Sequence, residues 1–559
     1  MNMRITIAIL ALLLSPAASQ NQRKFYVDDP LLKDEDTLDT PQEPGEIELS
    51  DLFDRFGHIF HDFGSTTWGE AENVNTLDEV PDSTWFTNRH GQESMTIQEL
   101  VRGPDRGPGP DPTQIWTIFR GKSQGITPGF SIIDEKGDRY VIKFSAPEYP
   151  SLNSASEVMA TKILYAIGYN TPENHIAYLK LENLRIQKGT MVTDRFGDQK
   201  PYTPKQLRQG LKSLKAESVG TYRVVASKYI EGQPLGPFRY YGRRDDDPND
   251  IYEHEQRREL RGLRLIAAWI NHDDTRAHNS LDSWVQENGR NYIRHYLIDF
   301  GSCFGSGTED LQLPNLSFHY WMEMGLIKKN VMGFGFHVPK YRTVNWPNLR
   351  KYPAVGRFES ENFDPEEWKN DYPNPAFVRM SERDAFWATK IIMRFTQEEL
   401  RAIVKTGEFG SSEEEEVFLR ILIDRQRKSG SFGLNRLNPL DEFRLTGSTL
   451  EFTNLSEKYG LASPGSSYIG HWGSYDNATA EHRFSGGPMT TSQPEFQLPG
   501  GNLSGTHEPF LTFTVRTQHA DHPQWNRSVR VYFRPVGQGY RITGIDREST
   551  PSVAPPEGS

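Results

Sequence analysis

The segment WINHDDTRAHNSL, residues 269–281, decides how the rest of the sequence is interpreted. It follows a long amphipathic helical pattern, so its polar residues begin where that helix should end. Asp274 and Asn279 lie five residues apart within it. Further on, the apolar run of YLIDFG, residues 296–301, predicts a strand that leads into a loop beginning with Asp299. The two segments together predict a polar site built from carboxylates and an amide.

A lysine on a predicted strand and a glycine-containing segment precede this site. The pattern RYVIKF, residues 139–144, is typical of a strand and carries Lys143. Gly121, Gly125 and Gly129 lie just before that strand, and glycines let a backbone approach phosphate groups closely. Their spacing is not that of a phosphate-binding glycine loop, and a plain hairpin turn explains them equally well.

Glu157 lies fourteen residues after Lys143, on a predicted helix that runs from Ser154 to Ile167. From there its carboxylate can hold the lysine toward phosphates. The alternative is a solvated helix face on which Glu157 has no partner. Phosphoryl transfer requires a lysine placed by a carboxylate, metal-binding groups and a carboxylate that receives a hydroxyl proton, and the chain offers each of these in order.

These segments resemble the protein-kinase superfamily, whose catalytic loop reads His-Arg-Asp, four residues and Asn, followed later by Asp-Phe-Gly. His272, Asp273 and Asp274 stand in the first three places, and Asn279 stands in the last. A lone Asp-Phe-Gly carries little weight in a chain of this length, but the ordered set is much rarer. The resemblance covers about residues 115 to 430.

The resemblance implies a role for each residue of the two central segments. Asp274 orients and deprotonates an acceptor hydroxyl, and Arg276 offsets charge on the transferred phosphoryl group. Asn279 and Asp299 hold the divalent metal, Mg²⁺ or Mn²⁺. The acceptor itself stays open, since hydroxyls of proteins, glycans and lipids all fit.

The resemblance also implies how ATP is bound. Lys143, held by Glu157, positions the α- and β-phosphates. Backbone groups near Ser227 and Tyr229, where the two lobes should join, hydrogen-bond the adenine. The glycine segment covers the phosphates.

Two departures separate the chain from eukaryotic-type protein kinases. Asp273 stands where many of those kinases carry the arginine that reads a phosphorylated activation loop. No Ala-Pro-Glu closes the segment after Asp299. The loop is more similar to those of atypical kinases, namely the HipA-type, spore-coat and phosphoinositide kinases. Control through an activation loop is therefore not expected.

The whole chain predicts an α+β, two-lobed protein-kinase-like fold. Short β-branched runs with one inserted helix favour a β-rich N-lobe, and the helical patterns after them favour a helical C-lobe. From about residue 435, strand patterns alternate with Gly, Ser, Asn and Thr. The predicted parts are a signal peptide (1–19), an acidic, mobile leader (20–50), an N-terminal extension (51–114), the N-lobe (115–232), the C-lobe (233–432) and a β-rich C-terminal domain with a flexible tail (433–559).

Periodicity and turn signals place further elements. The predicted strands are WTIF, FSIID, HIAYLKL and YRVVASKYI in the N-lobe, and FLTFTVRT, VRVYFRPV and GYRITGI in the C-terminal domain. The predicted helices are 255–270, 383–405 and 413–428, with capping pairs Thr396/Glu399 and Ser411/Glu414 as further helix starts. An amphipathic helix is also expected from Leu52 to Phe63, where His58 and His61 are part of a half-buried face rather than a metal pair.

The first residues, MNMRITIAILALLLSPAAS, are typical of a secretory signal peptide cleaved near Ser19. Their apolar run is about half of the ~20 residues that a membrane-spanning helix needs, and no later stretch is long and apolar enough. We therefore expect a periplasmic or secreted protein without a transmembrane segment. Its net charge of −12 and lack of a basic stripe argue against a nucleic-acid partner. The single cysteine, Cys303, cannot form a disulfide within the chain.

Three hypotheses about function remain at this point. The first is an exported atypical kinase that uses ATP and a divalent metal. The second is a kinase-fold protein of the cell envelope that binds or scaffolds without chemistry, which export favours because ATP is scarce outside the cytoplasm. The third is a structural envelope protein that works through its C-terminal domain.

Overall fold

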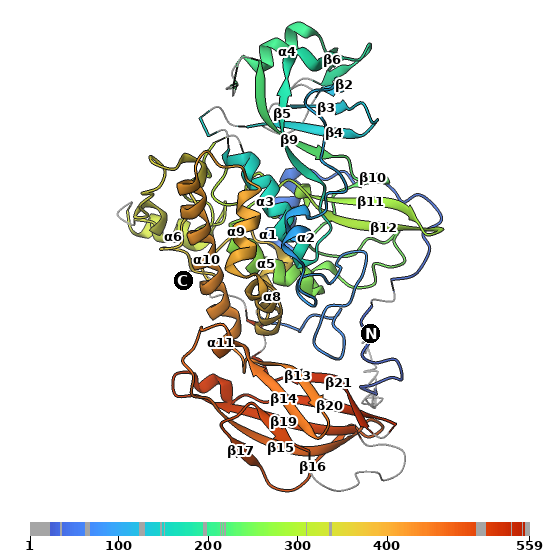
Figure 1. The fold of residues 1–559 in the computed structure, drawn as a ribbon, viewed down its shortest axis with the longest axis vertical. Coiled ribbons are helices and arrows are strands. Elements are labelled where there is room, and N and C mark those ends of the chain that lie inside the picture. The colour runs from blue at the N-terminus through green and yellow to red at the C-terminus, as the bar shows by residue number, and fades with distance from the viewer. Residues whose placement is uncertain are drawn as a thin grey trace, which may run out of the picture.

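Three parts are stacked along the long axis of the computed structural model (Figure 1). A β-rich lobe lies at one end, a helical lobe in the middle and a second β-rich part at the other end. The predicted fold class is confirmed, since the chain is α+β with a sheet-rich N-lobe, a helical C-lobe and a β-containing C-terminal domain.

The structure describes most of the chain. The described residues are 23–33, 36–61, 67–121, 129–145, 148–149, 151–193, 198–212, 214, 216, 218, 220–308, 310–334, 338–498, 510–537, 539–550 and 552–553. The predicted signal peptide, Gly125 and residues 554–559 of the predicted tail lie outside them. No helix in the described ranges is both long and apolar enough to cross a bilayer.

The helices and strands follow one another as labelled in Figure 1. The helices are α1 (Asp51–His61), α2 (Ile97–Arg102), α3 (Leu152–Ile167), α4 (Pro204–Leu211), α5 (Arg258–Ile270), α6 (Met324–Met332), α7 (Pro375–Val378), α8 (Glu382–Arg394), α9 (Gln397–Lys405), α10 (Ser412–Leu434) and α11 (Leu455–Lys458). The strands up to the C-lobe are β1 (Thr67–Trp68), β2 (Trp116–Gly121), β3 (Gly129–Ile133), β4 (Arg139–Phe144), β5 (Asn174–Lys180), β6 (Leu184–Ile186), β7 (Met191–Thr193), β8 (Gln199–Pro201), β9 (Thr221–Lys228), β10 (Gln233–Gly236), β11 (Ser280–Glu287) and β12 (Arg290–Leu297). The remaining strands are β13 (Leu440–Thr446), β14 (Thr449–Asn454), β15 (Ser467–Asp476), β16 (Glu481–Phe484), β17 (Met489–Thr491), β18 (Glu495–Gln497), β19 (Phe510–Gln518), β20 (Val529–Val536), β21 (Gly539–Arg547) and β22 (Ser552–Val553).

The N-lobe sheet has the strand order β5-β9-β4-β3-β2-β6, antiparallel except for the parallel pair β2 and β6. Alternation along β4 decides where its lysine lies, because successive side chains of a strand point to opposite faces. Tyr140, Ile142 and Phe144 are buried in the lobe's own hydrophobic core. Lys143 therefore points to the other face of the sheet.

Helix α3 connects the two lobes, because it follows β4 in the chain but packs in the core of the C-lobe. Met159, Ile163 and Ile167 are each at most 1% exposed. The same core contains α5, α8, α9 and α10, with Trp269 and Trp387 among its largest fully buried side chains.

A three-stranded sheet, β10-β11-β12, stands beside the helical lobe (Figure 1). Strands β11 and β12 form an antiparallel hairpin in which Ser280 lies opposite Leu297. The sequence predicted only the end of β12. Both strands contain many polar side chains, so their alternation is weaker than that of the N-lobe strands.

The prediction of a single helix over residues 383–405 is wrong. The chain leaves the helical conformation at Phe395 and Thr396, and α9 begins after Thr396 with a capping box to Glu399. The predicted capping pair Thr396/Glu399 therefore indicated the helix start more accurately than the helical periodicity of this region did. The predicted helix over 255–270 begins three residues later, as α5.

The predicted leader is not separate from the folded body. Its described residues form no helix or strand, but Thr40 N donates to Asn291 O (2.8 Å) and Ile47 N donates to Leu235 O (2.7 Å). Phe25 is buried against Tyr475, Phe510 and Tyr532 of the C-terminal domain. Acidic composition alone suggested mobility, but one buried aromatic side chain and backbone hydrogen bonds hold this segment in place.

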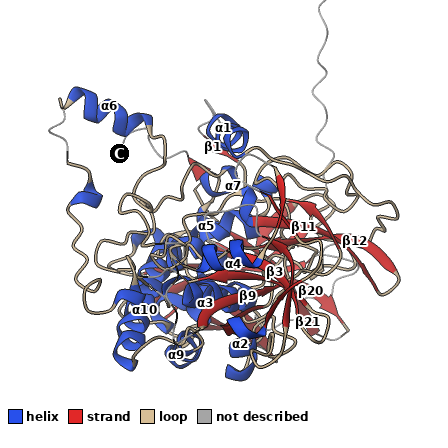
Figure 2. Ribbon diagram, turned by 90° about the horizontal axis from the view of Figure 1, so that it is seen from above, coloured by secondary structure: helices blue, strands red, loops and turns tan. Residues whose placement is uncertain are grey.

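Helix α1 lies at the rim of the molecule near α7 (Figure 2). Its amphipathicity is the reverse of the usual arrangement. Asp54 and His58 are buried, whereas Phe53 and Phe60 are 80% and 57% exposed. The polar face of α1 therefore packs against the body and its apolar face is exposed.

The C-terminal domain consists of two packed sheets with the strand orders β13-β14-β18 and β16-β15-β19-β20-β21. Trp472, Phe513 and Phe533 lie in the core between them. Alternating apolar residues in β19 and β20 allowed these strands to be predicted from the sequence.

Candidate active site

Lys143 lies at the centre of the candidate site. Its Nζ lies 3.2 Å from Oε1 of Glu157 and 3.0 Å from Oδ1 of Asp299. The three residues come from β4, from α3 and from the loop after β12, so both lobes contribute. The ion pair between Lys143 and Glu157 that the sequence predicted is present.

Several groups hold the Glu157 carboxylate, which is almost fully buried. Its Oε1 accepts from Phe300 N (3.2 Å) and from Asn174 Nδ2 (3.3 Å). Its Oε2 is buried and has no hydrogen-bond partner among the described residues. Gly301 approaches that oxygen so closely that an added Cβ would lie 3.2 Å from it, which explains a glycine at this position.

Two neighbouring carboxylates keep Lys143 charged. Burial alone would lower the pKa of Lys143, but the carboxylates of Asp299 and Glu157 outweigh burial and raise that pKa well above its usual value. Burial raises the pKa of Glu157, and Lys143 opposes that rise. The lysine is therefore a fixed positive charge at any physiological pH.

The catalytic-loop segment begins where α5 ends. Asn271 adopts a left-handed conformation (φ 54°) and ends the helix, which turns the chain into the loop. Asn279 Nδ2 donates to the backbone oxygen of Asp274 (2.7 Å) and closes the loop on itself. Arg276 Nε lies 2.7 Å from Asp274 Oδ1. The structure therefore brings the three predicted loop residues together.

Asp274, and not Asp273, is the accessible carboxylate of this loop. The Asp274 side chain is 25% exposed, whereas Asp273 is buried. Burial raises the pKa of Asp274 to about 6, although Arg276 and Asn279 oppose the rise. Burial raises the pKa of Asp273 further, and Asp274 adds to this effect. His272 is buried, which lowers its pKa to about 4 and keeps it neutral at pH 7.

Asp299 and Asn279, the two predicted metal ligands, are brought together by the backbone. Ile298 N donates to Asn279 O (3.0 Å), which continues the β11–β12 pairing by one step. Asp299 has a positive φ of 62°, and its side chain is 45% exposed. Because Asn279 Nδ2 is engaged by Asp274, its amide oxygen is the atom left for a metal.

These two residues fit Mg²⁺ or Mn²⁺ bound together with phosphates. Mg²⁺ is commonly held by one or two protein ligands plus phosphate oxygens, and one carboxylate with one amide oxygen is such a set. Among the described residues, no group of three or more His, Cys, Asp or Glu side chains is arranged for a metal ion.

Gly121 and Gly129 flank the segment that contains Gly125. Gly121 ends β2, and Gly129 begins β3 directly opposite Lys143. The glycine segment therefore joins two strands next to the lysine, as both a phosphate-covering loop and a plain hairpin require. Both interpretations stay predictions.

The predicted adenine contacts receive little support. Ser227 lies in the middle of the sheet, between Val141 and Asn174. The Tyr229 amide donates to Arg139 O (2.8 Å), and the Tyr229 hydroxyl lies 2.9 Å from Ser131 Oγ. The amide of Tyr229 is thus already used inside the N-lobe, which the sequence pattern did not reveal.

Three residues near the site were missed by sequence reasoning. Asn174 donates to both Glu157 and Thr161. Asp51 lies 3.3 Å from Arg276, and Asp371 N donates to Asp273 O (2.9 Å). Each of the three lies more than ninety residues away from the catalytic loop in the sequence, so no local motif could reveal them.

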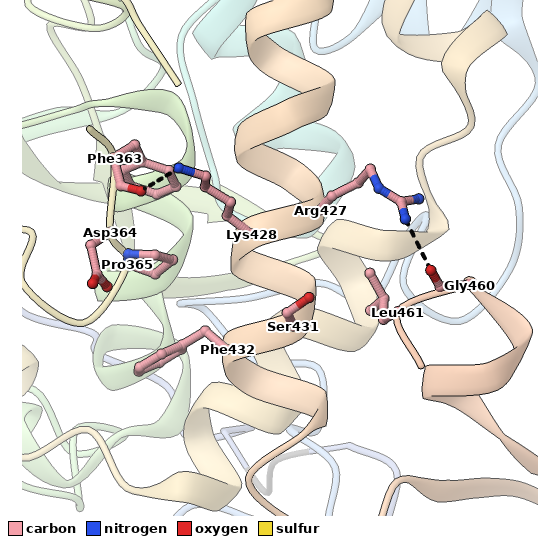
Figure 3. A pocket seen from close by; sticks show the side chains of 9 residues that line it. All are labelled: Phe363, Asp364, Pro365, Arg427, Lys428, Ser431, Phe432, Gly460 and Leu461. Atoms are coloured by element: carbon pink, nitrogen blue, oxygen red, sulfur yellow. Dashed lines mark hydrogen bonds between the residues drawn. The ribbon is translucent and has the colours of Figure 1, made fainter. Parts of the chain in front are cut away.

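A cavity of about 460 Å³ lies elsewhere, between α10 and the C-terminal domain (Figure 3). Lys428 and Arg427 line it, but Lys428 Nζ donates to Phe363 O (3.0 Å) and Arg427 Nη2 donates to Gly460 O (2.9 Å). None of the predicted site residues lines this cavity. Both cationic side chains that line the cavity already donate to backbone oxygens, so their positions are explained by the fold itself.

Comparison with known proteins gives matches among solved structures only. No protein-family model matches the chain, and no curated protein matches it. The Helicobacter pylori proinflammatory kinase CtkA is 13% identical, with a TM-score of 0.30, over 57% of this chain and 95% of that chain. The Golgi casein kinase is 9% identical (TM-score 0.27, 73% of this chain and 97% of that chain). Its form with Mn and ADP bound is 10% identical (TM-score 0.28, 72% and 94%).

The three structures named here are kinases. Because the TM-scores are low, the kinase-like interpretation of this chain rests on the geometry of its own residues. The HipA-type, spore-coat and phosphoinositide branches that the sequence suggested stay predictions.

Proposed function

We propose that this chain is an ATP-dependent kinase that transfers the terminal phosphate to an acceptor hydroxyl. One observation carries the proposal: Lys143 Nζ lies between Glu157 and Asp299, within hydrogen-bond distance of both. One buried lysine between two carboxylates leaves the site with an excess of negative charge until a further cation binds. Mg²⁺ with ATP supplies both the cation for Asp299 and the phosphates for Lys143.

The lysine binds and orients the nucleotide in this proposal. Glu157 cannot move far, because Phe300 N and Asn174 hold its carboxylate. Lys143 therefore has a fixed direction and presents its remaining donors to the α- and β-phosphates. Such positioning is a large part of catalysis when the protein itself does little covalent chemistry.

Asp274 accepts the proton of the acceptor hydroxyl. It is accessible, it belongs to the loop that carries Asn279, and its pKa of about 6 leaves it mostly ionised at pH 7. Arg276 lies beside it and offsets negative charge on the phosphoryl group as the bond to the leaving oxygen breaks.

Asp299 and the amide oxygen of Asn279 would hold the divalent metal. When bound, Mg²⁺ or Mn²⁺ neutralises charge on the phosphates and aligns them. The protein's own contribution is to keep one carboxylate and one amide oxygen at the same end of the β11–β12 hairpin.

We propose further that the kinase is exported, which the composition of residues 1–19 supports. Expression of the full chain in a bacterium and sequencing of the mature N-terminus test this. A start near Gln20 in the periplasmic fraction supports export, and an intact Met1 in the cytoplasm contradicts it. The acceptor hydroxyl belongs to a protein, glycan or lipid of that compartment.

The central test is phosphate transfer from γ-labelled ATP with Mg²⁺ or Mn²⁺ to the chain itself and to envelope proteins, glycans and lipids. Asp274→Asn should lower the rate by about 10²- to 10⁴-fold while preserving nucleotide binding. Asp521→Asn is the matched control, since Asp521 is exposed in the C-terminal domain. Equal rates for wild type and Asp274→Asn would contradict the role of Asp274.

A second candidate function is a scaffold that binds Mg-ATP without transferring phosphate. The observation that favours it is that the charged side chains of the catalytic loop already have partners within the protein, since Arg276 contacts both Asp274 and Asp51. An acceptor must compete with these contacts. Thermal stabilisation by Mg-ATP without transfer to any acceptor class supports the scaffold, and transfer at a rate abolished by Asp274→Asn excludes it.

A further inference from the structure

A second cavity, of about 360 Å³, lies where the N-terminal extension, the end of α3 and the β11–β12 hairpin meet. Its wall is mostly polar and contains three arginines and three tyrosines. They are Arg89, Arg290, Arg294, Tyr165, Tyr292 and Tyr296. This arginine cavity contains none of the residues assigned to nucleotide, metal or acceptor above.

Two of the arginines form no direct ion pair with a carboxylate of the described residues. Arg89 Nη1 donates to the backbone oxygens of Tyr165 (2.8 Å) and Tyr169 (3.2 Å), and Arg290 Nη1 donates to Asp36 O (2.8 Å). No described carboxylate lies within 4 Å of either guanidinium. Burial lowers the pKa of Arg89, which is the effect of a desolvated cation that a nearby anion would relieve.

The third arginine is neutralised within the protein. Arg294 forms a bidentate pair with Glu287, at 2.9 and 2.7 Å. The Asp36 carboxylate also faces the cavity wall, where Oδ2 accepts from Thr84 N (2.7 Å). Asp82 also acts on Arg89 through its charge, so three carboxylates, Glu287, Asp36 and Asp82, lie among the three arginines. Only Arg294 is in direct contact with one of them among the described residues.

Aromatic rings fix the two unpaired guanidinium groups in place. The Arg89 guanidinium lies 4.0 Å from the ring centre of Tyr165, and that of Arg290 lies 4.4 Å from the ring centre of Tyr292. Stacking of this kind restrains the side chain and leaves its in-plane N–H groups available. A planar arginine fork of this type binds the oxygens of a phosphate group in two parallel hydrogen bonds.

We propose that the arginine cavity binds a small phosphomonoester of about the size of a sugar phosphate. The cavity volume is in the range of ligand pockets, and the hydroxyl and amide groups of its wall can hydrogen-bond a polyol. Two unpaired, stacked arginines select the phosphate. The proposal does not depend on kinase activity, because it concerns a separate site.

The position of the cavity connects it to the active site. Tyr165 lies eight residues after Glu157 on α3, and Tyr296 lies three residues before Asp299. The loop between α3 and β5 is tied to β12, because Leu297 N donates to Asn170 O (3.0 Å) and Asn170 Nδ2 donates to His295 O (3.0 Å). A ligand in the cavity therefore contacts both elements that place the Lys143 partners.

The test is calorimetric titration of the full-length mature chain with glucose 6-phosphate, with glucose and glucuronate as controls. Glucose 6-phosphate should bind saturably and glucose should not. Arg290→Gln should weaken binding about tenfold or more, since a hydrogen bond to a charged group is lost. Arg483→Gln, in an exposed pair with Glu481, should bind as wild type does.

The same titration has outcomes that overturn the proposal. It is wrong if glucose 6-phosphate does not bind, if Arg290→Gln binds it as tightly as wild type, or if glucuronate binds more tightly, because the phosphate would then not be the selected group. Asp299→Asn must retain binding, since its loss would place the ligand in the nucleotide site. Tyr296→Phe, which preserves the ring, replaces Arg290→Gln if that variant does not fold.

Discussion

Asp274 makes activity depend on pH in a defined direction. Its carboxylate must be ionised to accept a proton, and its raised pKa of about 6 places half-protonation near that pH in the metal-free site. Bound Mg²⁺ favours the ionised form, so the loaded enzyme should titrate at or below this value. We expect kcat/KM to rise tenfold per pH unit below about pH 6 and to reach a plateau above it.

Initial rates of phosphate transfer between pH 4.5 and 8.5 measure this profile, with thermal unfolding at each pH as the control for folding. His272 cannot produce the same limb, because burial lowers its pKa to about 4. An acid limb centred above pH 7 would show that a group other than Asp274 accepts the proton.

Glu157 acts through Lys143, so its loss should affect the use of ATP. Glu157→Gln keeps the shape of the side chain but removes the charge that holds the lysine, and a misplaced phosphate-binding group costs on the order of 10²-fold in rate. We expect kcat/KM for ATP to fall by about that factor. Glu398→Gln, an exposed change on α9, is the control and should leave the rate unchanged. Wild-type kinetics in Glu157→Gln would mean that Asp299 alone positions the lysine.

The residues of the site could be predicted where motif spacing fixed them. The sequence predicted Lys143 and Glu157 as a pair and Asp299 as a metal ligand, and the structure places one oxygen of each carboxylate within 3.2 Å of Lys143 Nζ. Asn174 and Asp51 could not be predicted, because their contacts depend on how β5 and α1 pack against the site. A single sequence gives local patterns but not the packing of distant segments.

At the scale of elements, the start of α1 and the residues just before it are in contact with the catalytic loop. Asp51 Oδ1 lies 3.3 Å from Arg276, and Leu49 O lies 3.0 Å from His278 Nε2. If Arg276 serves the transferred phosphoryl group, Asp51 competes for it. Because a half-exposed pair is worth about 1 kcal/mol or less, Asp51→Ala should raise kcat by up to about fivefold.

The control for this effect is salt. Raising ionic strength screens the exposed pair, so the difference between wild type and Asp51→Ala should shrink in about 0.5 M NaCl. A loss of activity in Asp51→Ala at low salt would show instead that Asp51 positions Arg276 for catalysis.

The elements differ in how well the sequence predicted them. Strand β4 was predictable because Tyr140, Ile142 and Phe144 recur at every second position in a short run that also contains the β-branched Val141. Helix α1 was predicted, but its orientation was not, since its apolar face is exposed and Asp54 and His58 face the body. Periodicity identifies an amphipathic helix but does not say which face meets the protein.

At the scale of the whole molecule, buried ion pairs around Asp78 join the N-terminal extension to the helical lobe and to the C-terminal domain. Arg258 Nη1 lies 2.7 Å from Asp78, Arg383 lies 2.6 Å from it, and Arg547 of the C-terminal domain lies 3.4 Å from it. Burial would raise the pKa of Asp78, but the three arginines hold it well below its usual range. Arg547 also lies 3.1 Å from Asp441. The C-terminal domain is therefore coupled electrostatically to the helical lobe.

Arg547→Met tests this coupling, because it keeps much of the side-chain volume and removes the charge. The Arg547 side chain is 2% exposed, so its loss leaves Asp78 and Asp441 partly unpaired in a buried place, at a cost of about 3–5 kcal/mol. Urea unfolding should then separate into two transitions, with the C-terminal domain unfolding first, while the midpoint for the kinase-like lobes changes little. Arg483→Met, which breaks an exposed pair with Glu481, should unfold as wild type does. If Arg547→Met unfolds in one transition at the wild-type midpoint, these ion pairs do not couple the domains, and apolar contacts across the interface must do so.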